Sequence, residues 1–62
     1  MSTADPLMKA RRFHAVAQEN LQLAEAAPNA DARRHYARLA EHYLVMAKAE
    51  LESALRHASP FR

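Results

Sequence analysis

The sequence predicts an all-helical protein, an antiparallel hairpin of two helices over residues 6–26 and 30–58. Three observations predict it: an alanine-rich composition without glycine, two segments that no proline interrupts, and a short connection between them. Fifteen of the 62 residues are alanine, isoleucine is absent, and half of the chain is apolar. This composition favours helix over strand, because alanine is the best helix former and β-branched residues are scarce. We expect one domain over residues 1–62, with residues 1–4 and 59–62 as tails.

The predicted helix boundaries follow from capping residues and prolines. Asp5 is expected to cap the first helix, with Pro6 at its first position, where a proline loses no hydrogen bond. Pro28 ends this helix because it disfavours helical geometry in the residue before it. Asn29 is expected to cap the second helix, and Pro60 places its end near residue 58. So short a connection makes the two helices antiparallel neighbours.

Alanine recurs every seven residues in each helix, and folding the chain about Pro28 places the two series opposite each other. Small facing residues allow the helix axes to approach near the close end of the usual range of about 8–10 Å. Asn20 lies near the middle of the apolar stripe, where it either fixes the register inside the seam or meets water at its edge. The residues expected in this intramolecular seam are Ala10, Phe13, Ala17, Leu21, Ala24, Tyr36, Ala40, Tyr43 and Ala47.

Large apolar side chains outside the seam predict that the hairpin associates further. A chain of this size buries only about 60% of its unfolded surface, and without cysteine it has no disulfide or thiolate metal site to compensate. We expect a homodimer that closes into a four-helix bundle, or docking on a larger protein complex. The residues expected at this interface are Val16, Leu23, Leu44, Leu51, Leu55 and Phe61.

Five basic residues near the starts of the two helices define an alternative function. Cations are unfavourable there because of the helix dipole, so these residues are candidates for binding an anion such as a phosphate backbone. Those of the first helix point in three directions, so a patch would need two copies of the chain. The alternative is a small nucleic-acid-binding regulator, and its candidate contacts are Lys9, Arg11, Arg12, Arg33 and Arg34.

Neither a catalytic nor a metal-binding site is expected. His35 and His42 lie two turns apart, too far to bind one ion within a helix, so a metal would need His14, His57 or a glutamate across an interface. A phosphate-binding loop is excluded because the chain has no glycine. We therefore expect a non-enzymatic interaction, accessory or scaffold protein, without cofactor, metal or small-molecule substrate.

The location expected from the sequence is the cytoplasm, without membrane insertion. The longest strongly apolar run is far shorter than the roughly 20 residues that a membrane-spanning helix needs. The first residues also lack the basic and apolar regions of a secretory signal. The net charge of +2 is mild and indicates no particular class of partner.

Residues 29–47 resemble a family of small helical-hairpin proteins common in alphaproteobacteria. In that family a capped turn is followed by an arginine, an aromatic residue or leucine, Leu-Ala-Glu, a further aromatic residue, and Met-Ala or Leu-Ala. The matching residues here include Arg33, Tyr36, Leu39-Ala40-Glu41, Tyr43 and Met46-Ala47, with Leu23-Ala24-Glu25 before the turn. The resemblance implies a helical hairpin and brings no assigned activity. The layout is also similar to Rop-type hairpin dimers, which bind paired RNA, although no RNA-contact motif matches.

Overall fold

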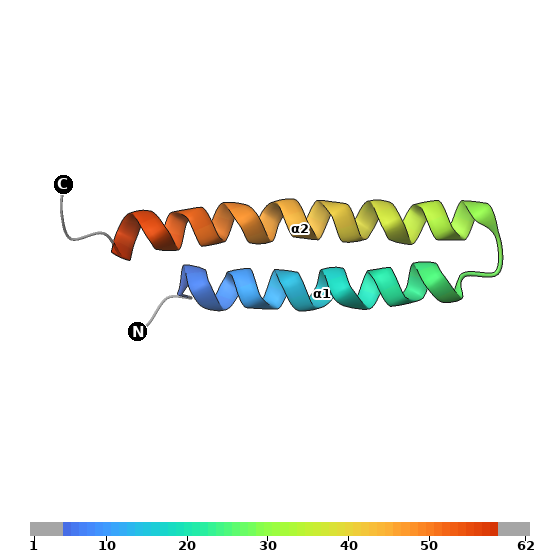
Figure 1. Cartoon of the computed structure of the whole chain (residues 1–62), viewed down its shortest axis with the longest axis horizontal. Helices are drawn as coiled ribbons and strands as arrows, with labels where there is room; N and C mark the ends of the chain where they lie inside the picture. The colour runs from blue at the N-terminus through green and yellow to red at the C-terminus, as the bar shows by residue number, and fades with distance from the viewer. Residues whose placement is uncertain (1–4, 59–62) are drawn as a thin grey trace.

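The computed structural model describes residues 5–58, which form two antiparallel α-helices joined by a short connection (Figure 1). Helix α1 spans Pro6–Ala26 and helix α2 spans Ala30–Ala58. The all-helical hairpin predicted from the sequence is therefore confirmed, and the described residues contain no strand. The predicted tails, residues 1–4 and 59–62, lie outside the described residues.

Side-chain caps start both helices at the positions that the sequence indicates. Asp5 Oδ1 accepts a hydrogen bond from the Leu7 backbone N–H at 3.3 Å, and Pro6 follows the cap directly. Asn29 Oδ1 accepts from the Ala32 backbone N–H at 2.8 Å. Each cap satisfies a backbone donor that the first helical turn would otherwise leave without a partner. The bounds of the helices are thus set by local chemistry.

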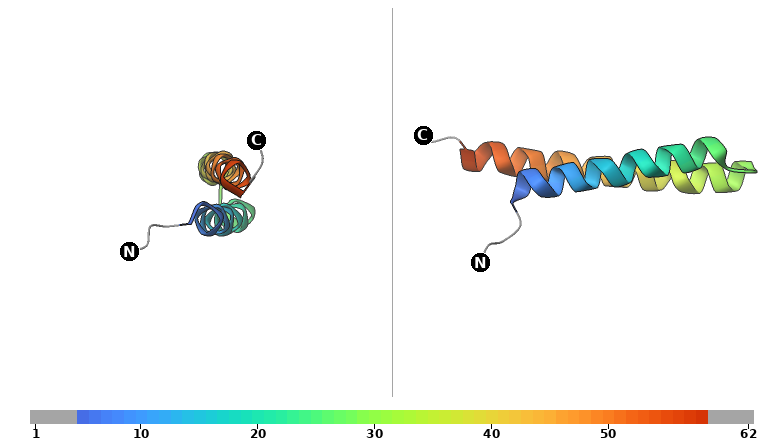
Figure 2. Two further views of the ribbon diagram at one scale, coloured as in Figure 1. Left: turned by 90° about the vertical axis from the view of Figure 1, so that its left-hand side faces the viewer. Right: turned by 90° about the horizontal axis from the view of Figure 1, so that it is seen from below.

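The hairpin is a single layer, one helix thick. It measures 50 × 25 × 11 Å, and seen end-on the two helices lie side by side (Figure 2). Helix α2 also extends beyond the start of α1 at the end of the layer that carries both termini, called here the open end (Figure 1). Because no third described element covers either side of the layer, the side chains on both sides meet solvent.

The apolar side chains that are buried in the seam between the helices are all small. The buried hydrophobic residues of the described chain are Ala10, Ala17, Ala24, Ala40 and Ala47. The two nearest the middle, Ala17 and Ala40, are 0% and 1% exposed, whereas no large side chain is fully buried among the described residues. Alanine allows close approach of the helices but removes little apolar area from water, and apolar area is what stabilises a core.

Two contacts across the seam show the register of the hairpin. The ring centroids of Phe13 and Tyr43 are 6.1 Å apart, with their planes tilted by 35°. Closer to the open end, Lys9 Nζ lies 3.8 Å from Glu50 Oε2. Both pairs join residues at the same level of the two helices. For Phe13 and Tyr43, this is the pairing that folding the chain about the connection predicts.

Asn20 is the one polar residue that is buried in the described chain, at 8% exposed. Its Nδ2 donates to the Val16 backbone oxygen at 2.9 Å, one turn earlier in α1. Among the described residues, every fully buried side-chain nitrogen and oxygen has a hydrogen-bond partner. Of the two positions that the sequence leaves open, the structure therefore favours the seam, with the amide turned back onto its own helix.

Candidate interaction surfaces

Apolar side chains lie on two opposite sides of the helix layer, which we call the groove face and the aromatic face. At about 100° per residue, side chains two positions apart on one helix point to opposite sides. Leu21 and Leu23 are such a pair on α1. The groove face is defined by Leu7, Leu21, Leu44 and Leu51. The aromatic face is defined by Phe13, Val16, Leu23, Leu39, Tyr43 and Met46.

The groove face contains a groove of about 420 Å³ between α1 and α2. Its apolar lining comes from the leucines of that face and from two seam alanines, namely Leu7, Ala10, Leu44, Ala47 and Leu51. Its polar lining is entirely basic, since it consists of Arg11, His14 and Lys48, without a carboxylate. This arrangement can receive an apolar surface bordered by negative charge.

A second groove, of about 630 Å³, continues from the first toward the open end. The two share Leu7 and Leu51, and the second is extended by Ala54 and Leu55 in the part of α2 that passes the start of α1. Leu55 is 63% exposed there. The open end therefore carries a continuous apolar strip along α2.

The predicted interface residues are divided between the two faces. Val16 and Leu23 belong to the aromatic face, whereas Leu44 and Leu51 line the groove on the opposite side and Leu55 lies at the open end. Phe61, the sixth of them, lies outside the described residues. The structure thus does not bring this set together on one surface.

Leu7 and Leu21 belong to the groove face, which is not where the sequence placed them. Leu21 was expected in the seam but is 39% exposed, because alanines one turn away on either side hold the helices too close for a leucine between them. Leu7 was not among the expected interface residues and is 43% exposed. The signal that would have found both is the spacing Leu7–His14–Leu21, which has the same seven-residue period as the alanines.

Two of the five predicted basic residues have acidic neighbours. Lys9 lies next to Glu50 across the seam, and Arg34 pairs with Asp31 in the first turn of α2. The other three of the five, Arg11, Arg12 and Arg33, are exposed and have no ion pair in the described structure. Since α1 and α2 are antiparallel, the basic group of α1 lies toward the open end and that of α2 lies at the turn. One hairpin therefore does not form a single basic patch.

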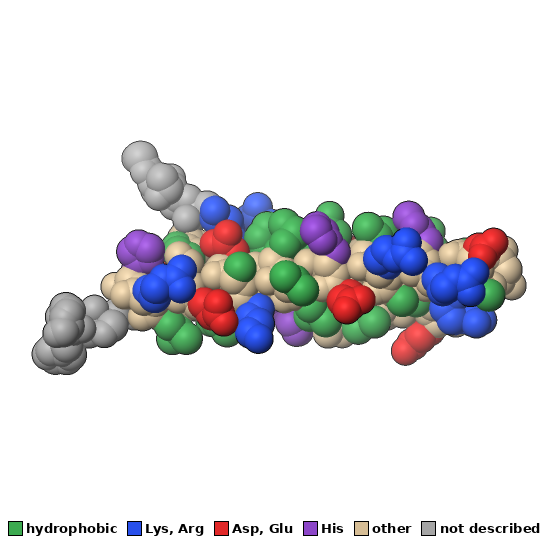
Figure 3. Space-filling model, turned by 90° about the horizontal axis from the view of Figure 1, so that it is seen from above, with side chains coloured by type: hydrophobic (Ala, Val, Ile, Leu, Met, Phe, Trp, Pro, Cys, Tyr) green, Lys and Arg blue, Asp and Glu red, His purple; other side chains and the backbone are tan. Residues whose placement is uncertain are grey.

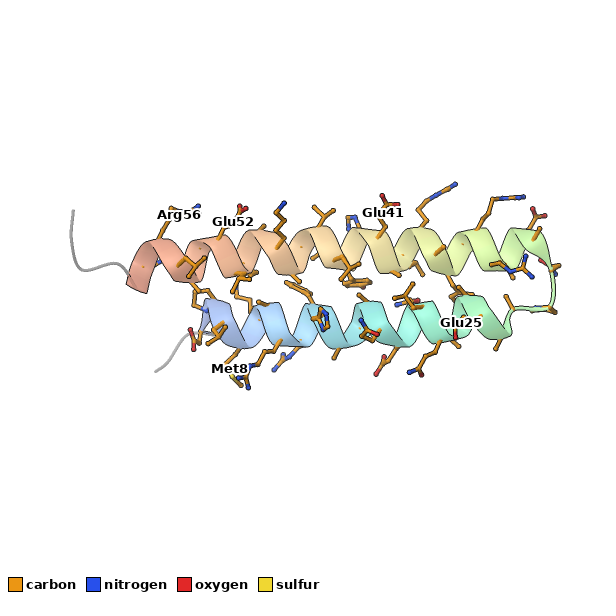
Figure 4. All side chains as sticks on the ribbon, viewed as in Figure 1. Met8, Glu25, Glu41, Glu52 and Arg56 are labelled. Carbon is orange, nitrogen blue, oxygen red and sulfur yellow. The ribbon has the colours of Figure 1, made fainter. Side chains whose placement is uncertain are left out.

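The outer surface of α2 is largely charged, while hydrophobic side chains gather along both of its long edges (Figure 3). Glu41, Glu52 and Arg56 point away from α1, and Met8 of α1 points away from α2 (Figure 4). Exposed charges of this kind keep a surface hydrated. The two edges, which are the groove face and the aromatic face seen from α2, are therefore the candidate interaction surfaces.

The histidines are distributed over the layer. His35 and His42 pack edge-on against Tyr36 and Tyr43, with centroid distances of 5.3 and 5.9 Å, and His14 lines the groove on the opposite side. Within residues 5–58, no three side chains of the metal-ligating types lie close enough to hold an ion.

Neither described helix combines the length and the apolarity that crossing a bilayer requires. Comparison with protein-family models, with curated proteins and with solved structures finds no match to this chain. The resemblance to the alphaproteobacterial hairpins stays a prediction.

Proposed function

We propose that this chain is a non-enzymatic protein–protein interaction module that self-associates, two hairpins closing into a four-helix bundle. One observation carries the proposal: the seam buries alanines and no large side chain, while leucines on the faces of the layer are about two-fifths exposed. Apolar side chains of this size stabilise a fold only when they leave water.

The energetics of a small chain support this reading. Ordering the backbone costs about 1–2 kcal/mol for each residue, and burial of apolar area returns only about 25 cal/mol for each Å². A seam of alanine methyl groups supplies little of that area. A second layer would bury the exposed leucines and supply the missing stabilisation.

The dimensions of the layer suit such a partner. Its broad sides extend over 50 × 25 Å, whereas a standard protein interface needs about 800 Å² from each partner. Two-fold dimers are the commonest homo-oligomers, and antiparallel helices in two layers form the usual four-helix bundle. A homodimer is therefore the simplest closure. Docking on a larger protein as an accessory subunit would bury the same leucines against a different partner.

Light scattering behind size-exclusion chromatography, over a hundredfold range of protein concentration, tests the proposal. We expect a mass of twice the 7.0 kDa of the chain, falling toward 7.0 kDa only at the lowest concentrations. A well-folded monomer at every concentration would contradict self-association. A poorly folded monomer would also contradict the homodimer and would support the accessory-subunit form, in which another protein covers the leucines.

Nucleic-acid binding is the second candidate, because Arg11, Arg12 and Arg33 are exposed and make no ion pair within the described residues. The two basic groups are separated along the layer by about 13 residues of helix, or roughly 20 Å at 1.5 Å per residue. A structured RNA duplex would then contact the two ends of the layer. The test is a gel-shift titration at low salt, where binding should weaken steeply as salt is raised. Absence of binding at low salt would exclude this function.

A further inference from the structure

We propose that a second copy of this chain occupies the groove face, with its turn lying over the open end of the first copy. This inference rests on the self-association proposed above and adds to it the face and the orientation of the dimer. Two features of the groove face carry it: its exposed leucines and the unequal distribution of charge along its length.

The exposure of the leucines selects the face. Leu7, Leu44 and Leu51 are 43%, 39% and 43% exposed, so about two-fifths of each of these leucines still meets solvent on this side. On the aromatic face the large side chains are half-buried except for Leu23, because Phe13 and Tyr43 already meet across the seam. A second layer therefore removes more leucine surface from water by packing on the groove face.

The charge selects the orientation. The open half of the groove face is bordered by Arg11, His14 and Lys48 without an acidic residue in the groove. Farther along the same side of α1, Gln18 and Glu25 follow Arg11 at seven-residue spacing, and Glu25 lies near the turn (Figure 4). From Arg11 to Glu25 the groove face of α1 thus runs from positive to negative, while at the extreme open end Asp5, the cap of α1, lines the second groove.

Two orientations about a two-fold axis are possible for copies that share this face. If both turns lay at the same end, α1 of each copy would lie over α2 of the other. Arg11 and Lys48 line the same groove and so lie at the same level. This orientation would bring two copies of each, four cations in all, together over one apolar groove, and like charges at an interface are strongly unfavourable.

If the turns lay at opposite ends, α1 of one copy would run antiparallel over α1 of the other. With the two helices centred on each other, Arg11 of one copy comes within about one turn of Glu25 of the other, which is within reach of long side chains. The two-fold axis generates this pair twice. Arg34 is the basic residue nearest the turn on the same side of α2. Because it is already paired with Asp31, it repels the cations of a second copy less than an unpaired arginine would.

A charge-reversal series tests the face and the orientation together. Arg11→Glu and Glu25→Arg should each weaken the dimer, because each places like charges opposite one another twice. At low ionic strength we expect the dissociation constant to rise about tenfold in each case, because each variant replaces two exposed attractive pairs by two repulsive ones. The double variant should regain the wild-type constant, and an equimolar mixture of the two single variants should form mainly the mixed dimer by native mass spectrometry.

Arg12→Glu is the matched control, because Arg12 is exposed and points away from the groove face by about 100° relative to Arg11. It should leave the dissociation constant unchanged. If Arg11→Glu tightened the dimer, the turns would lie at the same end and the proposed orientation would be wrong. If neither single variant differed from Arg12→Glu, the second copy would not occupy the groove face. A wild-type chain that is monomeric at every concentration would instead refute the self-association on which the inference rests.

Discussion

The two faces of the helix layer differ in how far their side chains reach across the alanine seam. On the aromatic face the rings of Phe13 and Tyr43 are long enough to meet, at 6.1 Å between centroids, and so cover the seam from that side. On the groove face the leucines point outward and leave a groove of about 420 Å³ between the helices. The aromatic face therefore contributes to the cohesion of one hairpin, whereas the groove face leaves its apolar surface exposed to solvent.

This difference arises from one property that the faces share, which is the close approach of the helices. Alanine in the seam brings the backbones together but leaves the layer one helix thick, 11 Å in its shortest dimension. The large apolar side chains beside the seam then lie on one face or the other. Residues that meet across the seam stabilise the monomer, and residues that do not are available to a partner.

The largest effect is expected from the seam itself, on which both faces depend. Ala17→Leu adds a side chain where the exposed fraction is 0%, so it must push the helices apart. We expect a loss of about 3 kcal/mol in the free energy of unfolding, at the upper end of overpacking effects and comparable to the whole stability of so small a domain. Thermal unfolding followed by far-ultraviolet circular dichroism measures it.

Ala15→Leu is the control for this substitution, because Ala15 lies on α1 two residues away and is exposed. The same added side chain should there change the unfolding midpoint little. Equal midpoints for the two variants would mean that the helices are not in close contact at Ala17, and the distinction between the two faces would lose its basis.

The helix bounds and the register were predictable because both depend on local or periodic features. Asp5 with Pro6 and the Pro28–Asn29 pair set the starts and the stop through capping and through the geometry of proline. The opposition of Phe13 and Tyr43 followed from the seven-residue alanine period and the length of the connection. None of these requires knowledge of how side chains pack.

The division into two faces was not predictable from the same pattern. A wide apolar stripe indicates that a helix is buried on one side, but it does not say which side chains reach across a seam of buried alanines. Leu21 illustrates this, because its spacing fits the seam while its size does not, and it is 39% exposed. Val16 and Leu44 were grouped as one interface although they lie on opposite sides of the layer.

A direct comparison of the faces uses the same substitution on each. Leu51 of the groove face and Leu23 of the aromatic face are similarly exposed, at 43% and 48%. If the second copy occupies the groove face, Leu51→Asp buries an unpaired carboxylate in the dimer and should raise the dissociation constant about 30-fold, or about 2 kcal/mol. Leu23→Asp should leave the constant within about threefold of wild type. Sedimentation equilibrium measures both, and a larger effect of Leu23→Asp would assign the dimer to the aromatic face.

The smallest effect expected is a gain in stability from replacing Asn20, whose buried amide lies on the same side of the seam as Phe13. Asn20→Leu removes a polar group that is 8% exposed and bonds only to its own helix, through Val16, and leucine is also the better helix former. We expect about 1 kcal/mol of added stability, measured by thermal unfolding at one fixed protein concentration because association also raises the midpoint. Gln22→Leu, at an exposed position on the same helix, is the control and should change little.

The same variant tests whether Asn20 fixes the register of the two helices. A polar residue in a helical seam often fixes register or oligomer state at some cost in stability. If Asn20 has this role, the Asn20→Leu hairpin should be more stable yet show weaker or multiple nuclear Overhauser contacts between Phe13 and Tyr43. A single sharp contact set with a raised midpoint would mean that the alanine series alone sets the register. A lowered midpoint would mean that the hydrogen bond to Val16 stabilises α1 by more than burial of the amide costs.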